Sequence, residues 1–130
     1  MQTLKLGFIG AGFIARFQAL ALKSVRGADI TAVNSPNRAA DFAQHVKRLG
    51  FPNCKPCATI KDLCDNCDVV CIFAPNYLRV EIMEAIVEAV KAGAELKGIA
   101  CEKPLGRTVA EAHKLVALAE SFSHSRSPGL

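Results

Sequence analysis

Residues 4–15 read LKLGFIGAGFIA, and this stretch decides the fold. A short apolar run breaks at two glycines and then resumes with helical spacing, which predicts a strand, a tight turn and a helix. The glycine spacing is G-x-G-x-x-A. Gly10 suits the turn, Gly12 allows the backbone to approach a pyrophosphate, and the small Ala15 allows the helix to pack close to the strand.

The start of this helix is a candidate anion site. The first N–H groups of a helix lack partners within the helix, and the helix dipole favours negative charge there. Gly12, Phe13 and Ile14 therefore offer donors to a dinucleotide pyrophosphate without any basic side chain. An ordinary strand-to-helix turn is the alternative, because glycines also mark turns. The strand before the glycines and the helical pattern at 16–22 favour the dinucleotide interpretation.

The rest of the chain repeats the alternation of strand and helix. Gly50 and Gly93 follow two of the expected helices, and Thr59 and Thr108 suit N-caps. Five repeats predict an α/β fold, a doubly wound parallel sheet of the Rossmann type, as one domain of about five strands with flanking helices over residues 1–122. Residues 123–130 change composition and predict a flexible tail. The expected strands after the first are 28–33, 55–58, 68–74 and 96–101, and the later expected helices lie within 38–49, 59–64, 78–92 and 108–122.

Composition narrows the class of protein. The chain has 130 residues, 51% hydrophobic and 22% charged, which is typical of a globular domain, and no apolar run is long enough to span a bilayer. The start resembles no secretory signal, so we expect a cytoplasmic protein without a membrane partner. The net charge of +4, from 16 basic and 12 acidic residues, is too small and scattered to indicate nucleic acid but suits an anionic small ligand.

Four of the six cysteines form two C-x-x-C pairs, Cys54/Cys57 and Cys64/Cys67. Such pairs suggest zinc or redox chemistry, but the six residues between them are few for a zinc ribbon and read as the start of a helix. Cysteine is also a small buried hydrophobe, and this core interpretation is favoured over a metal or a disulfide. We predict no metal site, and none of the three histidines (His45, His113, His124) is a credible base.

A ligand of this fold binds outside the carboxyl ends of the strands, near the point where strand order reverses. The turns after Ile9 and Val33 converge there, as do the segments 75–76 and 102–104.

The end of the second expected strand bears on the choice of nicotinamide cofactor. An acidic residue there usually holds the ribose hydroxyl of NAD, but no carboxylate precedes Asp41. Neutral hydrogen-bonding groups and a guanidinium suit a phosphate, so this segment favours NADP over NAD. The alternative is that Ser35 and Asn37 cap the next helix and Arg38 is solvated. The expected contacts are Asn34, Ser35, Asn37 and Arg38.

Three segments together resemble the Gfo/Idh/MocA family of nicotinamide-dependent oxidoreductases: residues 10–15, residues 68–76 and Glu102-Lys103-Pro104-Leu105. The resemblance covers residues 4 to 120. It implies that Ala74, Pro75 and Asn76 lie at the nicotinamide end, that Glu102 braces the site, and that Lys103 is the catalytic lysine. Without the motif, Lys103 would read as a surface lysine in a turn.

The sequence departs from this family in two respects. Members commonly carry a histidine three residues after the asparagine, where this chain has Arg79. The resemblance implies a second domain, which forms the substrate pocket, and a sixth strand of the nucleotide domain, and we expect this chain to lack both. We therefore expect a C-terminally truncated oxidoreductase domain with weak or no hydride transfer on a sugar or polyol. The alternative is a non-enzymatic nucleotide-binding or interaction module.

A domain of this kind leaves its last strand, 98–101, as an exposed sheet edge. We expect a homodimer that covers this edge.

Overall fold

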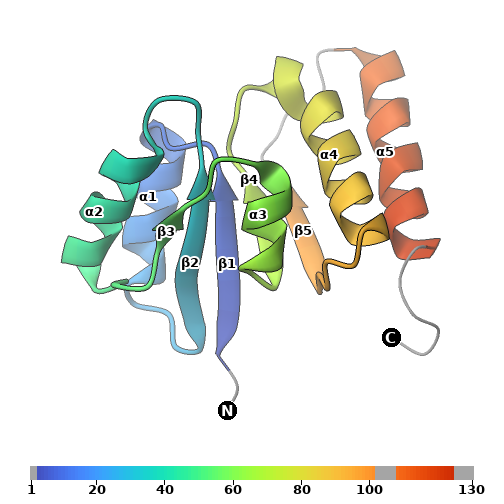
Figure 1. The fold of residues 1–130 in the computed structure, drawn as a ribbon. Helices are drawn as coiled ribbons and strands as arrows, with labels where there is room; N and C mark the ends of the chain where they lie inside the picture. The colour runs from blue at the N-terminus through green and yellow to red at the C-terminus, as the bar shows by residue number, and fades with distance from the viewer. Residues whose placement is uncertain (1–2, 102–107, 125–130) are drawn as a thin grey trace.

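The computed structural model describes residues 3–101 and 108–124. Their strands form one parallel sheet in the order β3-β2-β1-β4-β5 (Figure 1). The doubly wound sheet expected from the sequence is confirmed. The strands are β1 (Leu4–Ile9), β2 (Ala28–Asn34), β3 (Lys55–Pro56), β4 (Val69–Ile72) and β5 (Gly98–Cys101).

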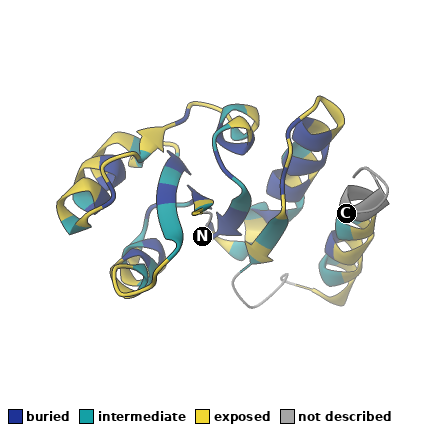
Figure 2. Ribbon diagram, turned by 90° about the horizontal axis from the view of Figure 1, so that it is seen from below, coloured by how far each residue is buried: buried dark blue, intermediate teal, exposed yellow. Residues whose placement is uncertain are grey.

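Helices cover both faces of the sheet (Figure 1). One apolar core lies between the sheet and α1 and α2, and a second lies between the sheet and α3, α4 and α5. Figure 2 shows the buried bands of these helices turned toward the sheet. The helices are α1 (Phe13–Leu22), α2 (Ala39–Leu49), α3 (Ile60–Asp65), the 3₁₀ helix η1 (Asn76–Leu78), α4 (Arg79–Lys91) and α5 (Val109–His124).

The ends of several elements differ from the sequence prediction: β3 ends at Pro56 and not at residue 58, and β4 spans Val69–Ile72 and not 68–74. β5 begins at Gly98 and not at residue 96, and α5 ends at His124, two residues beyond the expected end. Residues 125–130 lie outside the described residues, so the flexible tail stays a prediction. None of the helices in the described part of the chain is long and apolar enough to cross a membrane.

The central strands are buried on both faces. Val70 and Ile72 of β4 belong to the core under α3, α4 and α5, whereas Cys71 belongs to the core under α1 and α2. Complete burial of a side chain such as Ile72 stabilises the fold by about 1.5–3 kcal/mol. This two-sided burial explains the continuous apolar run of β4.

Four of the six cysteines are core residues. All six are free thiols, and Cys57, Cys64, Cys67 and Cys71 are buried. Burial raises the pKa of Cys64 and Cys67 to about 12 and that of Cys71 to about 11. Among the described residues, no group of three or more potential ligands could hold a metal ion. The core interpretation is confirmed for these four thiols, while Cys54 and Cys101 are half-buried.

Caps define two helix ends as predicted. The Oγ1 of Thr59 accepts a hydrogen bond from the backbone N–H of Asp62 at 3.0 Å, at the start of α3. The Oγ1 of Thr108 accepts one from the N–H of Glu111 at 3.1 Å, at the start of α5. Each bond supplies a partner to an N–H that the helix itself cannot satisfy.

Candidate functional site

A cleft of about 930 Å³ opens at the carboxyl edge of the sheet. It lies between the loops that follow β1, β2 and β4, as the sequence predicts. The predicted residues that line it are Gly10, Gly12, Phe13, Ile14, Asn34, Ser35, Asn37, Arg38, Ala74 and Pro75.

Gly10 lies where three strand ends meet. Its N–H donates to the carbonyl oxygen of Asn34 at 2.9 Å. A Cβ atom added at Gly10 would lie 2.7 Å from the backbone nitrogen of Ala74 and 2.8 Å from the carbonyl carbon of Phe73. The φ angle of Gly10 is +107°, a region that side chains rarely allow. Both the backbone conformation and the close approach of the β4 loop therefore require glycine here.

Gly12 is different, because the fold alone does not require glycine at this position. It is the N-cap of α1, its φ is −86°, and an added Cβ would meet no atom within 4 Å. The open space lies in front of the first turn of α1, where N–H groups and the helix dipole favour an anion. An absent side chain facing empty space is the shape that a pyrophosphate needs, so the residues present fit a dinucleotide.

The end of β2 is organised by Asn34. Its Nδ2 donates to the carbonyl oxygen of Cys57 at 2.9 Å, which holds the side-chain amide between β2 and the end of β3. Arg38 occupies the N-cap position of α2, makes no capping hydrogen bond with its side chain and is exposed. Ser35 and Asn37 precede that position, so the alternative in which they cap α2 is wrong.

The first carboxylate beyond this strand already has a partner. Asp41, in the first turn of α2, accepts from Nη2 of Arg16 at 2.7 Å. Within the described ranges 3–101 and 108–124, the side chain of Arg38 makes no hydrogen bond or ion pair, although its backbone carbonyl oxygen accepts from the N–H of Phe42 at 2.9 Å. Arg38 is thus a cation available beside the cleft.

One wall of the cleft is apolar, and the sequence analysis missed it. Tyr77, Leu78 and Ile82 come from η1 and the first turn of α4, and Ile60 comes from α3. Glu81 adds one carboxylate to this wall. The spacing of Leu78 and Ile82, four residues apart on a helix, was the available signal.

One predicted site residue of the described structure, Asn76, does not line this cleft. Asn76 begins η1 between two lining residues, Pro75 and Tyr77, but is not itself part of the lining. Glu102 and Lys103 lie outside the described residues, so their roles stay predictions.

Arg79 stands where the resembling family carries histidine, and it is the buried charged side chain of the described structure, with only 4% of its surface exposed. Its Nε and Nη1 atoms are buried and have no hydrogen-bond partner in the part of the chain that the structure describes.

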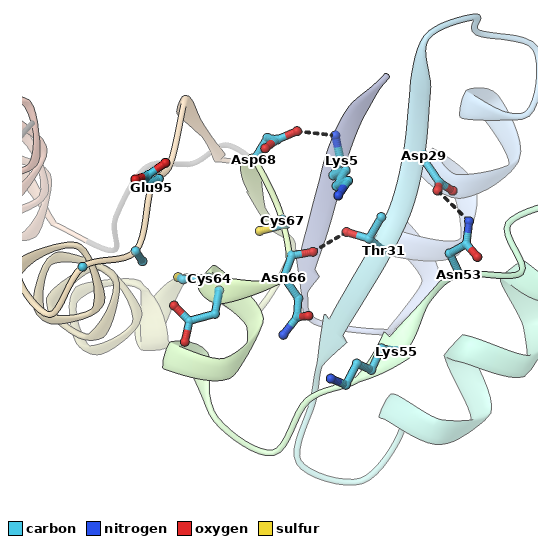
Figure 3. A pocket seen from close by; sticks show the side chains of 13 residues that line it. Lys5, Asp29, Thr31, Asn53, Lys55, Cys64, Asn66, Cys67, Asp68 and Glu95 are labelled. Atoms are coloured by element: carbon cyan, nitrogen blue, oxygen red, sulfur yellow. Dashed lines mark hydrogen bonds between the residues drawn. The ribbon is translucent and has the colours of Figure 1, made fainter. Parts of the chain in front are cut away.

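A second pocket, of about 570 Å³, lies at the opposite, amino edge of the sheet (Figure 3). Its polar groups bond to one another. Asp68 accepts from the backbone N–H of Lys5 at 2.9 Å, and Thr31 donates to the carbonyl oxygen of Asn66 at 2.6 Å. These bonds tie the strand starts together, so we assign the pocket a structural role and place the candidate site at the carboxyl edge.

Comparison with known proteins relates the chain to a family of oxidoreductases. The sequence profile described as "Oxidoreductase family, NAD-binding Rossmann fold" (GFO_IDH_MocA) matches residues 4–127. The chain is 30% identical, over 127 residues, to glucose-6-phosphate 3-dehydrogenase of Bacillus subtilis (strain 168), covering 96% of this chain and 33% of that protein. It is 32% identical, over 152 residues, to levoglucosan dehydrogenase of Pseudarthrobacter phenanthrenivorans, covering 100% of this chain and 36% of that protein.

A solved structure extends the likeness. Biliverdin reductase of Synechocystis sp. PCC 6803, in complex with biliverdin and NADP+, superposes with a TM-score of 0.68 at 27% identity. The match covers 92% of this chain and 35% of that protein. The chain therefore spans about a third of the length of each of these three proteins.

Proposed function

The chain belongs to the Gfo/Idh/MocA family of oxidoreductases and forms its NAD(P)-binding Rossmann domain, and we propose that the carboxyl-edge cleft binds NADP(H) in preference to NAD(H). The observation that carries the proposal is the open space in front of Gly12, at the start of α1, in a cleft that the exposed Arg38 also lines.

In this proposal, two groups of residues bind two different parts of the nucleotide. The first N–H groups of α1, at Gly12, Phe13 and Ile14, hold the pyrophosphate. Arg38, supported by polar groups at the end of β2, holds the 2′-phosphate of the adenosine ribose. The polar groups are those of Asn34, Ser35 and Asn37, and all of these residues line one cleft.

At the other end of the cleft, the segment after β4 positions the nicotinamide. Pro75 restricts the backbone next to the ring, and Ala74 approaches Gly10 closely enough to leave no room for a side chain between them. A bound nicotinamide supplies hydride transfer. In this proposal Lys103 contacts the substrate and Glu102 and Asn76 brace the site. We propose weak or no turnover by this chain alone.

The proposed substrate class is a sugar or polyol. The two curated relatives are named for carbohydrate substrates, glucose 6-phosphate and levoglucosan. Because the chain spans about a third of each relative, the individual sugar is left to a substrate screen.

Calorimetric titration with NADPH and NADH tests the cofactor proposal. We expect NADPH to bind more tightly than NADH, and Gly12→Val to lose both because the side chain fills the pyrophosphate space. Gly98→Val is the matched control. An added Cβ at Gly98 also meets no atom within 4 Å, and Gly98 is the first residue of β5, so it lies at the amino edge of the sheet and not at the carboxyl-edge cleft. No heat with either nucleotide, or equal losses in both variants, would contradict the proposal.

Arg38→Ala separates the two cofactors. A hydrogen bond to a charged group contributes about 1.5–3 kcal/mol, which corresponds to a loss of roughly 10- to 100-fold in NADPH affinity. We expect NADH affinity to change by less than about threefold. Equal losses for both nucleotides would show that Arg38 does not contact the 2′-phosphate.

Lys103→Ala distinguishes an enzyme from a binding module. If the chain turns over, this variant should abolish the substrate-dependent change in cofactor absorbance and leave nucleotide affinity unchanged. A wild-type chain that binds nucleotide but shows no such change with a panel of sugars and polyols would favour the binding module.

The homodimer is a further part of the proposal. β5 is an edge of the described sheet, and a groove of about 250 Å³ opens beside it on the α1 side. Phe17 and Leu20 of α1 are large apolar side chains that are more than half exposed. A second copy would cover these surfaces, and Phe17→Glu should weaken the dimer. Light scattering that gives a monomer at micromolar concentration would refute it.

A further inference from the structure

Arg79 is a buried cation without a counter-charge in the described structure. It begins α4, directly after η1, at the carboxyl edge where β4 ends. Only 4% of the residue is exposed, and neither Nε nor Nη1 has a hydrogen-bond partner among the described residues. A guanidinium does not lose its proton in proteins, so it cannot avoid this cost by becoming neutral. An unpaired buried charge is strongly unfavourable and indicates an anion that completes the site.

The surroundings of Arg79 on its own helix supply no carboxylate. Met83 and Ile86, four and seven residues later, share its helix face and are buried in the apolar core. Glu81 and Glu84 are exposed and lie on other faces of α4. Arg79 is the first residue of α4, so the positive end of the helix dipole lies at its backbone and favours an anion near this turn.

The anionic groups of the cofactor already have other partners in the proposed function. The pyrophosphate is assigned to the first turn of α1, and the 2′-phosphate is assigned to Arg38. Leu78 of η1 and Ile82 of α4, one residue before and three residues after Arg79, line the same cleft, although Arg79 is not itself a lining residue. The guanidinium therefore belongs to the segment that forms one wall of the cleft, and no cofactor anion is assigned to it.

We propose that Arg79 is a specificity-determining residue that binds an oxyanion of the substrate, either a phosphate or a carboxylate substituent on a sugar or polyol. The planar guanidinium presents paired N–H donors whose spacing matches both groups. This inference rests on the proposed function, because it assigns the substrate class of that same site. It selects sugar phosphates or sugar acids over neutral sugars.

Thermal unfolding of the 130-residue chain tests the inference. The Tm is measured in KCl, in inorganic phosphate and in lactate at the same ionic strength. We expect phosphate or lactate to raise the wild-type Tm by about 3 °C or more over KCl. Arg79→Met should unfold at a higher temperature than wild type in KCl, because it removes the unpaired charge, and should gain nothing from either anion. Arg26→Met, which removes an exposed arginine, should behave as wild type.

Each outcome decides for or against the inference. A gain with phosphate alone indicates a phosphorylated substrate, and a gain with lactate alone indicates a sugar acid. A lower Tm of Arg79→Met in KCl would show that the chain itself pairs the guanidinium, and would overturn the inference. The absence of an anion effect on the wild-type Tm would also overturn the inference. An anion effect that Arg79→Met retains would overturn it too, because it would indicate binding at the N-terminus of α1.

Arg79→Gln repeats the test if the methionine variant does not fold. It keeps hydrogen-bond donors but removes the charge, and should also lose the anion effect. The titration contains no nucleotide, so its failure leaves the cofactor proposal standing, while absent NADPH binding with an intact anion effect would refute only the cofactor proposal.

Discussion

Adding a single methyl group at Gly10 tests how closely the β1 and β4 loops approach each other. The new Cβ in Gly10→Ala would lie 2.7 Å from the nitrogen of Ala74, 2.8 Å from the carbonyl carbon of Phe73 and 3.1 Å from its oxygen. All three atoms are backbone, so no side chain can rotate away to make room. Either the β1 turn or the segment after β4 must move.

The expected cost has two parts. Holding alanine at a φ of +107° costs about 1–3 kcal/mol. Overpacking against a fixed backbone costs about a further 1–3 kcal/mol. A total near 3 kcal/mol lowers the Tm of a chain of this size by roughly 10 °C.

Urea unfolding followed by circular dichroism measures this loss, and Gly12→Ala is the matched control. Gly12 has a φ of −86° and no atom within 4 Å of its added Cβ. The free energy of unfolding should therefore change by less than about 0.5 kcal/mol in Gly12→Ala. The pair of variants thus separates the two glycines: the fold requires glycine at position 10 and does not require it at position 12.

Equal stability of the two variants would refute this reasoning. It would mean that the segment after β4 yields to the methyl group at no cost, and that the cleft floor is not held by contact between the two loops.

The other predictions concern packing, ionisation and capping. A Cβ added at Gly7 would lie 2.7 Å from Sγ of Cys67, so Gly7→Ala should cost about 1–3 kcal/mol, and the additional change Cys67→Ala should restore part of it in a double-mutant cycle. Burial raises the pKa of Cys64 and Cys67 from 9.0 to about 12. Because the unfolded chain releases these thiol protons at a lower pH than the folded chain, the urea midpoint of unfolding should hold steady below about pH 9 and fall as the pH rises toward 12. Cys64→Ala should reduce this fall. Thr59→Ala removes the cap of α3 and should lower the free energy of unfolding by about 1 kcal/mol in urea titrations, whereas Lys61→Ala, which breaks an exposed ion pair, should change it by less than about 0.5 kcal/mol.

Local patterns were sufficient to predict the order of elements. The period of apolar residues distinguishes strand from helix within a few residues, and a cap such as Thr59 acts on an N–H three positions away. The resulting strand-helix alternation restricts the topology, because parallel strands joined by helices are almost always connected with one hand. Of the 19 described residues that line the cleft, eight were predicted from the glycine motif and the end of the second strand, since the carboxyl ends of the strands must share one edge, and Ala74 and Pro75 were predicted from the family resemblance.

Patterns of spacing were less able to decide what each residue contacts. The paired cysteines have a spacing that suits metal as well as core, and only the burial of Cys57, Cys64 and Cys67 in the folded chain decides for the core. Ser35 and Asn37 have the side chains of caps, but α2 begins at Ala39, after both of them. The apolar wall of the cleft combines Tyr77 with Ile60 of α3, which packing alone brings together.

The sequence by itself determined the parallel α/β sheet, the edge at which the site lies and the glycines that shape it, because each follows from interactions between residues close together in the chain. Only the tertiary structure decided that Gly10 meets the backbone after β4, that Asn34 is held by Cys57, and that Arg79 is buried without a partner among the described residues. These facts depend on segments distant in sequence packing against one another. The burial of a polar side chain such as Arg79, and hydrogen bonds between distant segments, depend on the whole fold. They leave no periodic pattern in the sequence.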